Sequence, residues 1–335
     1  MGIWTKRGAA VLGSAMLLAL AACGDEGTAI DEREAATARL LASGGNGDDW
    51  GAIGFSYDEA RHSPLTDIND ANVGELGIAW FADLEDARGQ EATPVVVDGK
   101  LYVSHAWSKV SAWDAASGKK LWSFDPEVPG EKAVNACCDV VNRGVALWGD
   151  KLFVGTIDGR LIALDRLSGK ELWSEQTTDP DRPYTITGAP RVVKDMVLIG
   201  NGGAEMGVRG YVSAYSADSG TLLWRFYTTP NPAKTDDGAA SDAIFAKSAN
   251  ATWSDKGEWQ QSGGGGTVWD AIVYDQQLDQ VIIGVGNGNP WNHGTRSAGQ
   301  GDNWFLSSVV ALDADTGAYK WHFQETPAET WDYTA

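Results

Sequence analysis

Two adjacent cysteines, Cys137 and Cys138, are the most unusual chemical feature of this sequence. Neighbouring cysteines can pair only through a strained eight-membered ring, which lies outside ordinary disulfide geometry. Strain of this kind persists mainly at functional sites. Two free thiols or a pair of metal ligands are the alternatives, although the whole chain holds only four histidines and three cysteines. We therefore expect the segment around this pair to carry function.

The cysteine pair lies between copies of a repeat that ends in tryptophan. Each copy contains a turn with Ser or Thr followed by Gly, and a Trp four residues after that Gly. The closing residues are Trp122, Trp173, Trp224 and Trp321, so the spacings are 51, 51 and 97 residues, the last close to twice the first. An internal period of this length predicts a repeat architecture.

Each repeat reads as four short strands joined by tight turns. In the second copy the expected strands are 144–148, 152–155, 161–164 and 171–173, and glycines in the turns supply positive φ. Four-stranded units of this kind are the blades of a β-propeller. The predicted fold class is therefore all-β, with the closing Trp packed between adjacent blades. The blades are expected at about 91–124, 143–173, 187–224 and 266–323, with long loops at 225–265 and 290–305.

Two segments predict a propeller that is incomplete. Trp80 reads as part of a final strand that completes another blade, and residues 331–335 read as the middle of a strand. A repeat stack needs closure or capping. We therefore expect this chain to be a truncated sequence, with about four blades of a larger ring.

The N-terminal residues predict export. Lys6 and Arg7 precede an apolar run, 11–22, that is too short for an ordinary membrane span. The run ends in Leu20-Ala21-Ala22-Cys23, which resembles a bacterial lipobox in which Cys23 is acylated; an ordinary cleavage site is the alternative. The expected divisions are a signal at 1–23, a tether with a short helix from near Asp31 at 24–50, and the propeller at 51–335. The predicted location is the periplasm, anchored to a membrane only by lipid, where an oxidising environment allows disulfides.

The composition excludes one class of partner. Lys and Arg total 26 against 46 Asp and Glu, for a net charge of -20. Such a chain repels phosphate backbones, so we expect no nucleic-acid partner.

Several long motifs carry a family resemblance. They occupy 57–65, 90–94, 137–143, 185–190, 202–210, 266–269 and 286–292. In this order they resemble the N-terminal half of a pyrroloquinoline quinone (PQQ)-dependent alcohol dehydrogenase, particularly the quinohaemoprotein type, whose fold is an eight-bladed β-propeller. The resemblance runs from Tyr57 to the last residue.

The resemblance implies a cofactor role for a set of residues. The disulfide ring of Cys137 and Cys138 would cover one face of the flat quinone and Trp269 the other. Arg143 would contact a carboxylate of PQQ. The residues implied to hydrogen-bond around its rim are Glu91, Thr187, Gly203, Ala204 and Thr267.

The same resemblance implies a cation and a base. Glu205 and Asn287 would be oxygen ligands of Ca²⁺, and Asp332 would be the catalytic base and a third member of the metal set. Relatives that use lanthanides carry an extra Asp at the position of Thr334, so Ca²⁺ is expected. Each residue also has a plain structural reading, such as a surface Glu, a blade-anchoring Trp or a turn Asn. Trp269, however, lies outside the register of the closing tryptophans.

The implied reaction is oxidation of a small alcohol to an aldehyde or ketone, with electrons passed to a cytochrome c or similar acceptor. Haem c is implied only in relatives that carry a C-terminal haem domain, beyond Ala335. A non-enzymatic propeller lipoprotein of the outer-membrane assembly type is the alternative, and it has no use for the cysteine pair or Asp332. An electron-transfer protein would need a Cys-x-x-Cys-His haem motif, which the sequence lacks. The resemblance also puts further cofactor contacts in later blades, so we expect these residues alone neither to fold stably nor to oxidise alcohols.

Overall fold

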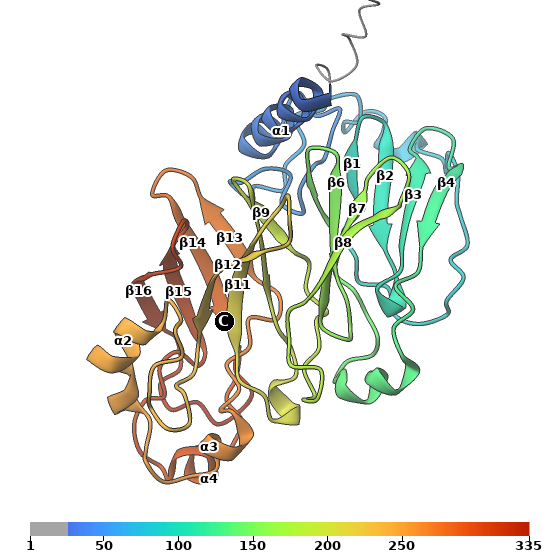
Figure 1. The fold of residues 1–335 in the computed structure, drawn as a ribbon. Helices are drawn as coiled ribbons and strands as arrows, with labels where there is room; N and C mark the ends of the chain where they lie inside the picture. Colours follow the sequence, from blue (N-terminus) through green and yellow to red (C-terminus); the bar gives the residue numbers. More distant parts are fainter. Residues whose placement is uncertain (1–25, 335) are drawn as a thin grey trace, which may run out of the picture.

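The computed structural model describes residues 26–334, and in this range four antiparallel sheets of four strands stand side by side in an arc (Figure 1). Every sheet is a simple meander, since each strand pairs with the next one along the chain. The prediction of four blades is confirmed. The strand bounds are β1–β4 at Val95–Val97, Lys100–Ser104, Val110–Asp114 and Lys120–Phe124; β5–β8 at Ala146–Trp148, Lys151–Gly155, Arg160–Asp165 and Glu171–Gln176; β9–β12 at Arg191–Val193, Met196–Gly200, Tyr211–Ser216 and Leu222–Tyr227; and β13–β16 at Ile272–Asp275, Gln280–Val285, Ser308–Asp313 and Tyr319–Gln324.

Burial along the strands reflects their place in a blade. In the second and third sheets the second strands, β6 and β10, are buried at every position because neighbouring blades cover both faces. The fourth strands are more exposed, with an alternating pattern in β4 and β16. Alternation is what a strand with one solvated face requires.

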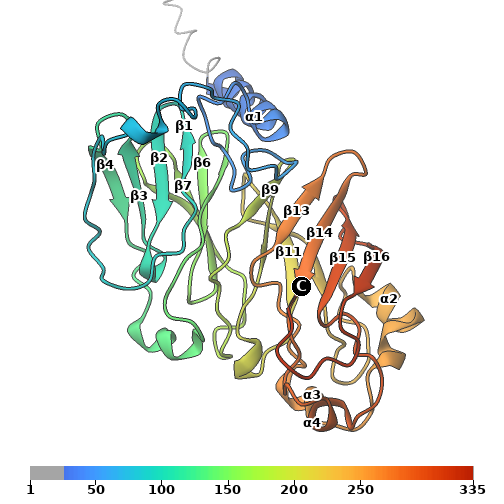
Figure 2. The same cartoon turned by 180° about the vertical axis from the view of Figure 1, so that it is seen from behind.

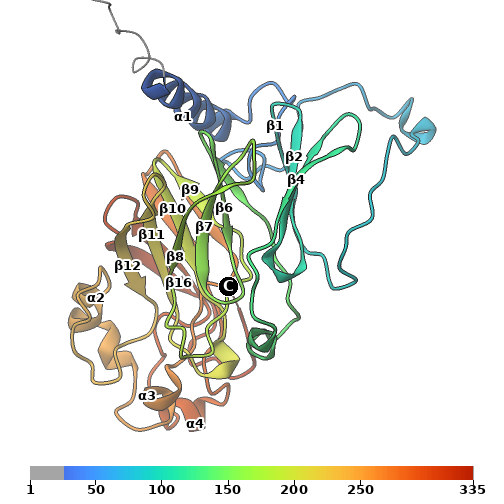
Figure 3. The ribbon, with the colours of Figure 1, turned by 45° about the vertical axis from the view of Figure 1, so that its right-hand side comes forward.

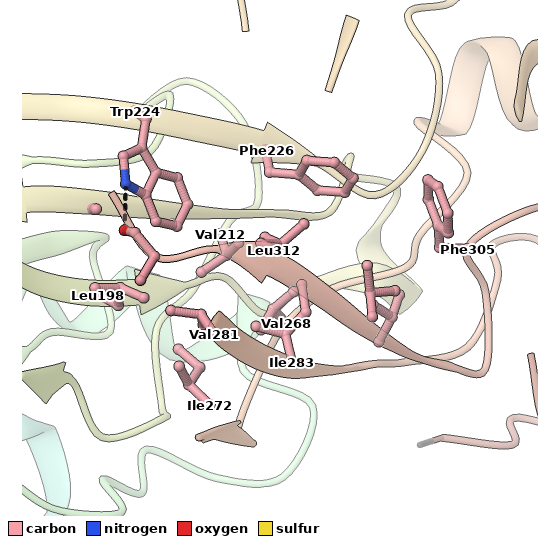
Figure 4. Packing of buried hydrophobic residues seen from close by; sticks show 14 of the residues in the cluster. Leu198, Val212, Trp224, Phe226, Val268, Ile272, Val281, Ile283, Phe305 and Leu312 are labelled. Atoms are coloured by element: carbon pink, nitrogen blue, oxygen red, sulfur yellow. Dashed lines mark hydrogen bonds between the residues drawn. The ribbon is translucent and has the colours of Figure 1, made fainter. Parts of the chain in front are cut away.

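Apolar side chains from adjacent sheets form the core. Between the third and fourth blades, Val212 and Phe226 lie opposite Val281, Ile283 and Leu312 (Figure 4). Burying each of these side chains contributes about 1.5–3 kcal/mol. The same packing between the first two pairs of blades links the four sheets into one body.

Three of the closing tryptophans, Trp122, Trp173 and Trp224, pack between blades as predicted, while Trp321 stays exposed because the described residues hold no following blade. The Trp122 indole N–H donates to the carbonyl of Arg166 in the next blade at 3.1 Å, and Trp224 donates to Ala314 at 3.2 Å. Each of these three rings lies against the turn glycine of the next blade; a Cβ on Gly169 would come within 2.5 Å of the Trp122 ring. This glycine has φ of 71°, so the residue allows both the turn and the close approach of the ring.

The Trp80 segment differs from its prediction. Residues 76–88 form no strand, and Ile78 and Phe81 are exposed. Trp80 nevertheless docks like the other closing tryptophans, with its indole N–H donating to the Ala115 carbonyl at 2.9 Å. The side chain makes the expected contact, but the described residues provide no inner strands with which its backbone could pair. Figure 3 shows η1 (Val73–Glu75), just before this segment, standing apart from the sheets.

Other boundaries also changed. The N-terminal helix α1 spans Glu26–Ser43, beginning five residues before its predicted start, and residues 331–334 are not a strand. The two long loops contain short helices: α2 (Asp242–Lys247), η5 (Ala249–Thr252), α3 (Trp259–Ser262) and α4 (His293–Ser297). No helix among residues 26–334 is both long enough and apolar enough to cross a membrane. The predicted signal and Cys23 lie outside the described residues.

The meander order separates two kinds of connection. Turns between first and second strands, and between third and fourth strands, lie at one end of each antiparallel blade. Helix α1 lies at this end, where Thr37 accepts a hydrogen bond from the Gly149 amide at 3.0 Å. The remaining connections lie at the opposite end, together with α3 and α4 (Figure 2).

Candidate functional site

The predicted site residues all lie at the end of the blades opposite α1. Thr187 precedes β9 and Trp269 precedes β13, while Glu205 and Asn287 lie in connections between second and third strands. The antiparallel order brings both types of connection to the same end. Residues far apart in the sequence can therefore surround one cavity.

An open pocket of about 280 Å³ lies among these connections. This volume is close to the lower end of the roughly 300–1,000 Å³ range of ligand-binding cavities. Ten of the twelve residues predicted to bind cofactor or metal line it, and they are Cys137, Cys138, Arg143, Thr187, Gly203, Glu205, Thr267, Trp269, Asn287 and Asp332.

The two other predicted residues lie next to the pocket. Glu91 pairs with Arg143, and Ala204 is buried between Gly203 and Glu205. Five further residues line the pocket that the sequence does not predict as site residues: Ala136, Val141, Thr185, Gly202 and Thr334. Most of them flank predicted residues in the same motifs, and that adjacency was the available signal.

Arg143 forms one wall of the pocket. Its guanidinium contacts Glu91 Oε2 at 2.9 Å and donates to Thr187 Oγ1 at 2.5 Å. The guanidinium carbon lies 4.8 Å from the centre of the Trp269 ring, a cation–π distance. Arg143 is thereby held as a fixed cation beside an aromatic plane, an arrangement suited to a flat anion.

The cysteine pair lies on the pocket wall after η3 (Gly130–Asn135). The structure has both residues as free thiols with their Sγ atoms 2.6 Å apart, so the disulfide predicted between them is not formed in it. Burial raises the pKa of the Cys137 thiol to about 12, and a hydrogen bond with Cys138 adds to this effect. The Cys137 thiol is therefore uncharged at neutral pH.

Glu205 and Asn287 meet in the pocket. Glu205 lies in η4 (Ala204–Met206), between Gly203 and Gly207, whose φ values are 98° and 84°. The Asn287 amide donates to Glu205 Oε1 at 3.1 Å, and Asn287 is only 3% exposed. The Asn287 amide also carries an oxygen. Once the amide group is rotated to present it, Glu205 and Asn287 offer two oxygen ligands to one cation.

Asp332 adds a second carboxylate. Burial raises its pKa above the ordinary value, and the negative charges of Glu205 and Glu329 raise it further. The neighbouring residue Tyr333 is held by the Ser307 hydroxyl, which donates to the Tyr333 carbonyl at 2.6 Å. The negative charge of Glu205 near Asp332 makes this a site that a cation would stabilise.

These residues fit a cation and a flat anionic cofactor. Residues 26–334 contain no cluster of three His, Cys, Asp or Glu side chains spaced for a metal. A cation here would therefore be held by two carboxylates and an amide, the oxygen donors that Ca²⁺ accepts. Trp269 supplies an aromatic face and Arg143 a charge for a carboxylate, which matches the chemistry of a planar quinone acid.

Comparison with known proteins gives the family context of this pocket. Residues 50–335 match the family model described as glucose/ethanol/alcohol dehydrogenase, β-propeller domain, with PQQ as its short name. The chain is 54% identical over 317 residues to an alcohol dehydrogenase (quinone) dehydrogenase subunit of Gluconobacter oxydans, covering 93% of this chain and 41% of the relative. It is 55% identical over 298 residues to the quinohemoprotein alcohol dehydrogenase ADH IIB of Pseudomonas putida, covering 89% of this chain and 42% of the relative.

A solved structure agrees with these sequence matches. The crystal structure of quinohemoprotein alcohol dehydrogenase from Comamonas testosteroni superposes with a TM-score of 0.84 at 49% identity. The match covers 92% of this chain and 46% of that one. The chain thus spans about two fifths of the length of the curated relatives it matches.

Proposed function

This chain belongs to the glucose/ethanol/alcohol dehydrogenase β-propeller family, and from that membership we propose that it provides the PQQ- and calcium-binding blades of an alcohol dehydrogenase. The observation that carries this proposal is the gathering of ten predicted cofactor, metal and catalytic residues around one pocket. They come from six separate segments of the chain, so the fold, and not proximity in the sequence, brings them together.

The chain's own residues would hold the two groups. Trp269 and the cysteine pair would enclose the planar ring system, with a disulfide between Cys137 and Cys138 stiffening one side. Arg143 would bind a cofactor carboxylate, while Glu91 and Thr187 fix the guanidinium. Calcium would take oxygen ligands from Glu205, Asn287 and Asp332.

When bound, the quinone supplies the acceptor for a hydride and calcium supplies a Lewis acid. Asp332 would act as general base, because its carboxylate takes the proton from the alcohol hydroxyl. Partial desolvation and the nearby carboxylates of Glu205 and Glu329 raise its pKa, which makes it a stronger base than an isolated solvated aspartate. The product is an aldehyde or a ketone.

The wider setting belongs to the same proposal. We place the protein in the periplasm, attached through lipid at Cys23, with a cytochrome c or similar protein as electron acceptor. The uncharged Thr334 in the pocket favours Ca²⁺ over a lanthanide. We also propose that these 335 residues alone do not oxidise alcohols, since Trp321 and Phe323 on β16 stay 41% and 64% exposed where a further blade would cover them.

The test is dye-linked oxidation of short primary alcohols by protein loaded with PQQ and Ca²⁺. The protein used in the test should carry a complete ring of blades. Asp332→Asn is the matched variant, because asparagine has the shape of aspartate but cannot act as the base. We expect the variant to bind PQQ but to lose at least about 100-fold in kcat, as general base catalysis contributes 10²–10⁴-fold. A loaded protein that oxidises no alcohol, or an Asp332→Asn variant with full activity, would contradict the proposal.

A further inference from the structure

A fully buried ion pair lies beneath the proposed calcium ligands. Arg296 Nη1 contacts Glu329 Oε1 at 3.1 Å, and neither side chain is exposed. Burying two charges is costly unless further hydrogen bonds satisfy both groups. The surroundings of this pair therefore show what it holds in place.

Glu329 bonds to the backbone beside both Asn287 and Asp332. Its Oε1 accepts from the Gly288 amide at 2.7 Å, immediately after Asn287. Its Oε2 accepts from the Trp331 amide at 3.2 Å, immediately before Asp332. One carboxylate thus links two segments that are separate in sequence and meet at the pocket.

Arg296 secures the same two segments from the other side. It donates to the carbonyls of Pro290 and Trp291 at 2.8 and 2.9 Å, and to the Glu329 carbonyl at 2.6 Å. Its Nε donates to Asn303 Oδ1 at 3.0 Å. The guanidinium is therefore satisfied by the loop that carries Asn287 and by the segment that carries Asp332.

A glycine permits this arrangement. A Cβ on Gly288 would lie 2.6 Å from the Arg296 guanidinium carbon, closer than real Cβ contacts allow. The guanidinium can thus pack directly against the backbone next to Asn287. Neither Arg296 nor Glu329 lines the pocket itself.

We propose that Arg296 and Glu329 are a positioning pair that sets the spacing between Asn287 and Asp332, so that both reach one calcium ion. This inference rests on the proposed function. Residues behind metal ligands that fix their orientation typically alter metal affinity by about 10–100-fold when changed. The pair acts through the backbone, which distinguishes it from the ligands.

A double variant that lacks the charges of Arg296 and Glu329 distinguishes an effect on ligand positioning from an effect on stability. Arg296→Met alone and Glu329→Leu alone each leave a buried charge without a partner, so both should lower the Tm. The double variant removes both charges at similar volume and should regain much of the lost Tm. It still leaves the Gly288 and Trp331 amides without their acceptor. We expect its Kd for Ca²⁺, measured by titration of the PQQ-loaded protein, to stay about 10–100-fold weaker than that of the parent.

A milder variant keeps the proposal testable if the double variant does not fold. Glu329→Gln retains an oxygen toward Gly288 and replaces the acceptor of the Trp331 amide with an NH₂ group. The Asp332 segment should therefore loosen more than Asn287, and kcat should fall about tenfold while KM changes little. An unchanged kcat, or equal changes in kcat and KM, would overturn the positioning role.

The control is Arg166→Met at the opposite end of the blades. Arg166 is 8% exposed and pairs with Asp98 at 2.6 Å, remote from the pocket residues. This variant should lower the Tm and leave the Kd for Ca²⁺ within about twofold. Recovery of Ca²⁺ affinity along with Tm in the double variant would refute the inference. A parent protein with a complete ring of blades that binds neither PQQ nor Ca²⁺ would instead refute the proposed function.

Discussion

At the scale of single residues, the pocket is lined by two carboxylates, Glu205 and Asp332, and one guanidinium, Arg143. The Asn287 amide donates to Glu205, while Arg143 is fixed by Glu91 and Thr187. Such a site is poised for a cation and an anion at adjacent points. Its selectivity should therefore respond to one added charge.

Thr334 is the residue at which that charge can be added. Thr334→Asp puts a third carboxylate into the pocket, which favours a trivalent lanthanide over Ca²⁺ because the ion carries more charge. We expect the Kd for La³⁺ to tighten by at least about tenfold relative to that for Ca²⁺, in line with about 1.4 kcal/mol per tenfold change. Thr334→Asn, which has the same shape without the charge, should not show this shift. Competitive titration of the two ions checks the prediction, and equal selectivity in the two variants would contradict it.

His322 makes folding sensitive to pH. Its ring packs 4.4 Å from the Trp304 ring and 4.9 Å from the Phe305 ring, and burial lowers its pKa. Below about pH 6.5 the unfolded chain gains a proton that the folded state resists, so the free energy of unfolding should fall as pH drops from that value toward the folded pKa.

The variant His322→Phe keeps the aromatic packing and removes the titration. Urea unfolding at pH 7 and pH 5 should show a smaller loss of stability in the variant than in the parent. Burial also lowers the pKa of His105, so part of the loss should remain. Identical losses in parent and variant would rule out His322 as a source.

At the scale of elements, the turn after each third strand matters as much as the strands. In the second blade, Asp165 accepts from both the Ser168 amide and the Ser168 hydroxyl, and Gly169 then turns the chain beneath Trp122. A register shift occurs at the matching position of all four described sheets, between Ala112 and Trp113 in the first. The turn, the register shift between the third and fourth strands, and the Trp on the fourth strand therefore recur together as one structural unit.

Two glycines of the same backbone conformation test the docking contact. Gly169 and Gly99 have φ of 71° and 67°, but a Cβ would meet Trp122 only at Gly169 and nothing within 4 Å at Gly99. Both Ala variants carry the strain of positive φ, about 1 kcal/mol or more. We expect Gly169→Ala to lower the free energy of unfolding by roughly 1–3 kcal/mol more than Gly99→Ala, the cost typical of overpacking. Urea titration measures the difference, and equal losses would mean that the Trp contact contributes nothing.

The elements also show how far the sequence could be read. The blades were predictable because the Trp and Gly positions repeat and each turn has its own local chemistry. Ten of the predicted residues line one pocket, and they were predicted because long motifs resembled a family. The Arg296–Glu329 pair was not foreseen, because both residues lie in irregular segments without a period and their pairing depends on tertiary structure. The strand predicted to end at Trp80 is wrong, since the apolar pattern of residues 76–80 cannot reveal whether inner strands are present to pair with it.

At the scale of the whole molecule, the described blades form an arc with apolar surface along its borders. Phe323 on β16 is 64% exposed, and Ile78 and Phe81 are more than 80% exposed. Monomeric proteins rarely leave such residues together in water. Surfaces of this kind favour contact with another blade or another chain.

Self-association of this 335-residue chain is the measurable outcome. We expect multi-angle light scattering to show a mass that rises with concentration, and Phe323→Lys to reduce that rise. Phe153→Lys is unsuitable as a control because this residue is buried, so Leu278→Lys on an exposed hairpin serves instead. A monomer at all concentrations, or an equal effect of both variants, would contradict the role of the β16 face.

Because the two ends of each blade are separate, they can evolve independently of each other. Docking tryptophans and their turns occupy one end, and the connections that build the pocket occupy the other. The long connection between β12 and β13 holds three short helices, and the Trp224 contact with Ala314 lies away from them at the other end. Substrate preference can therefore diverge by loop replacement while the framework stays under separate selection. For the same reason, loops exchanged between relatives should transfer as modules.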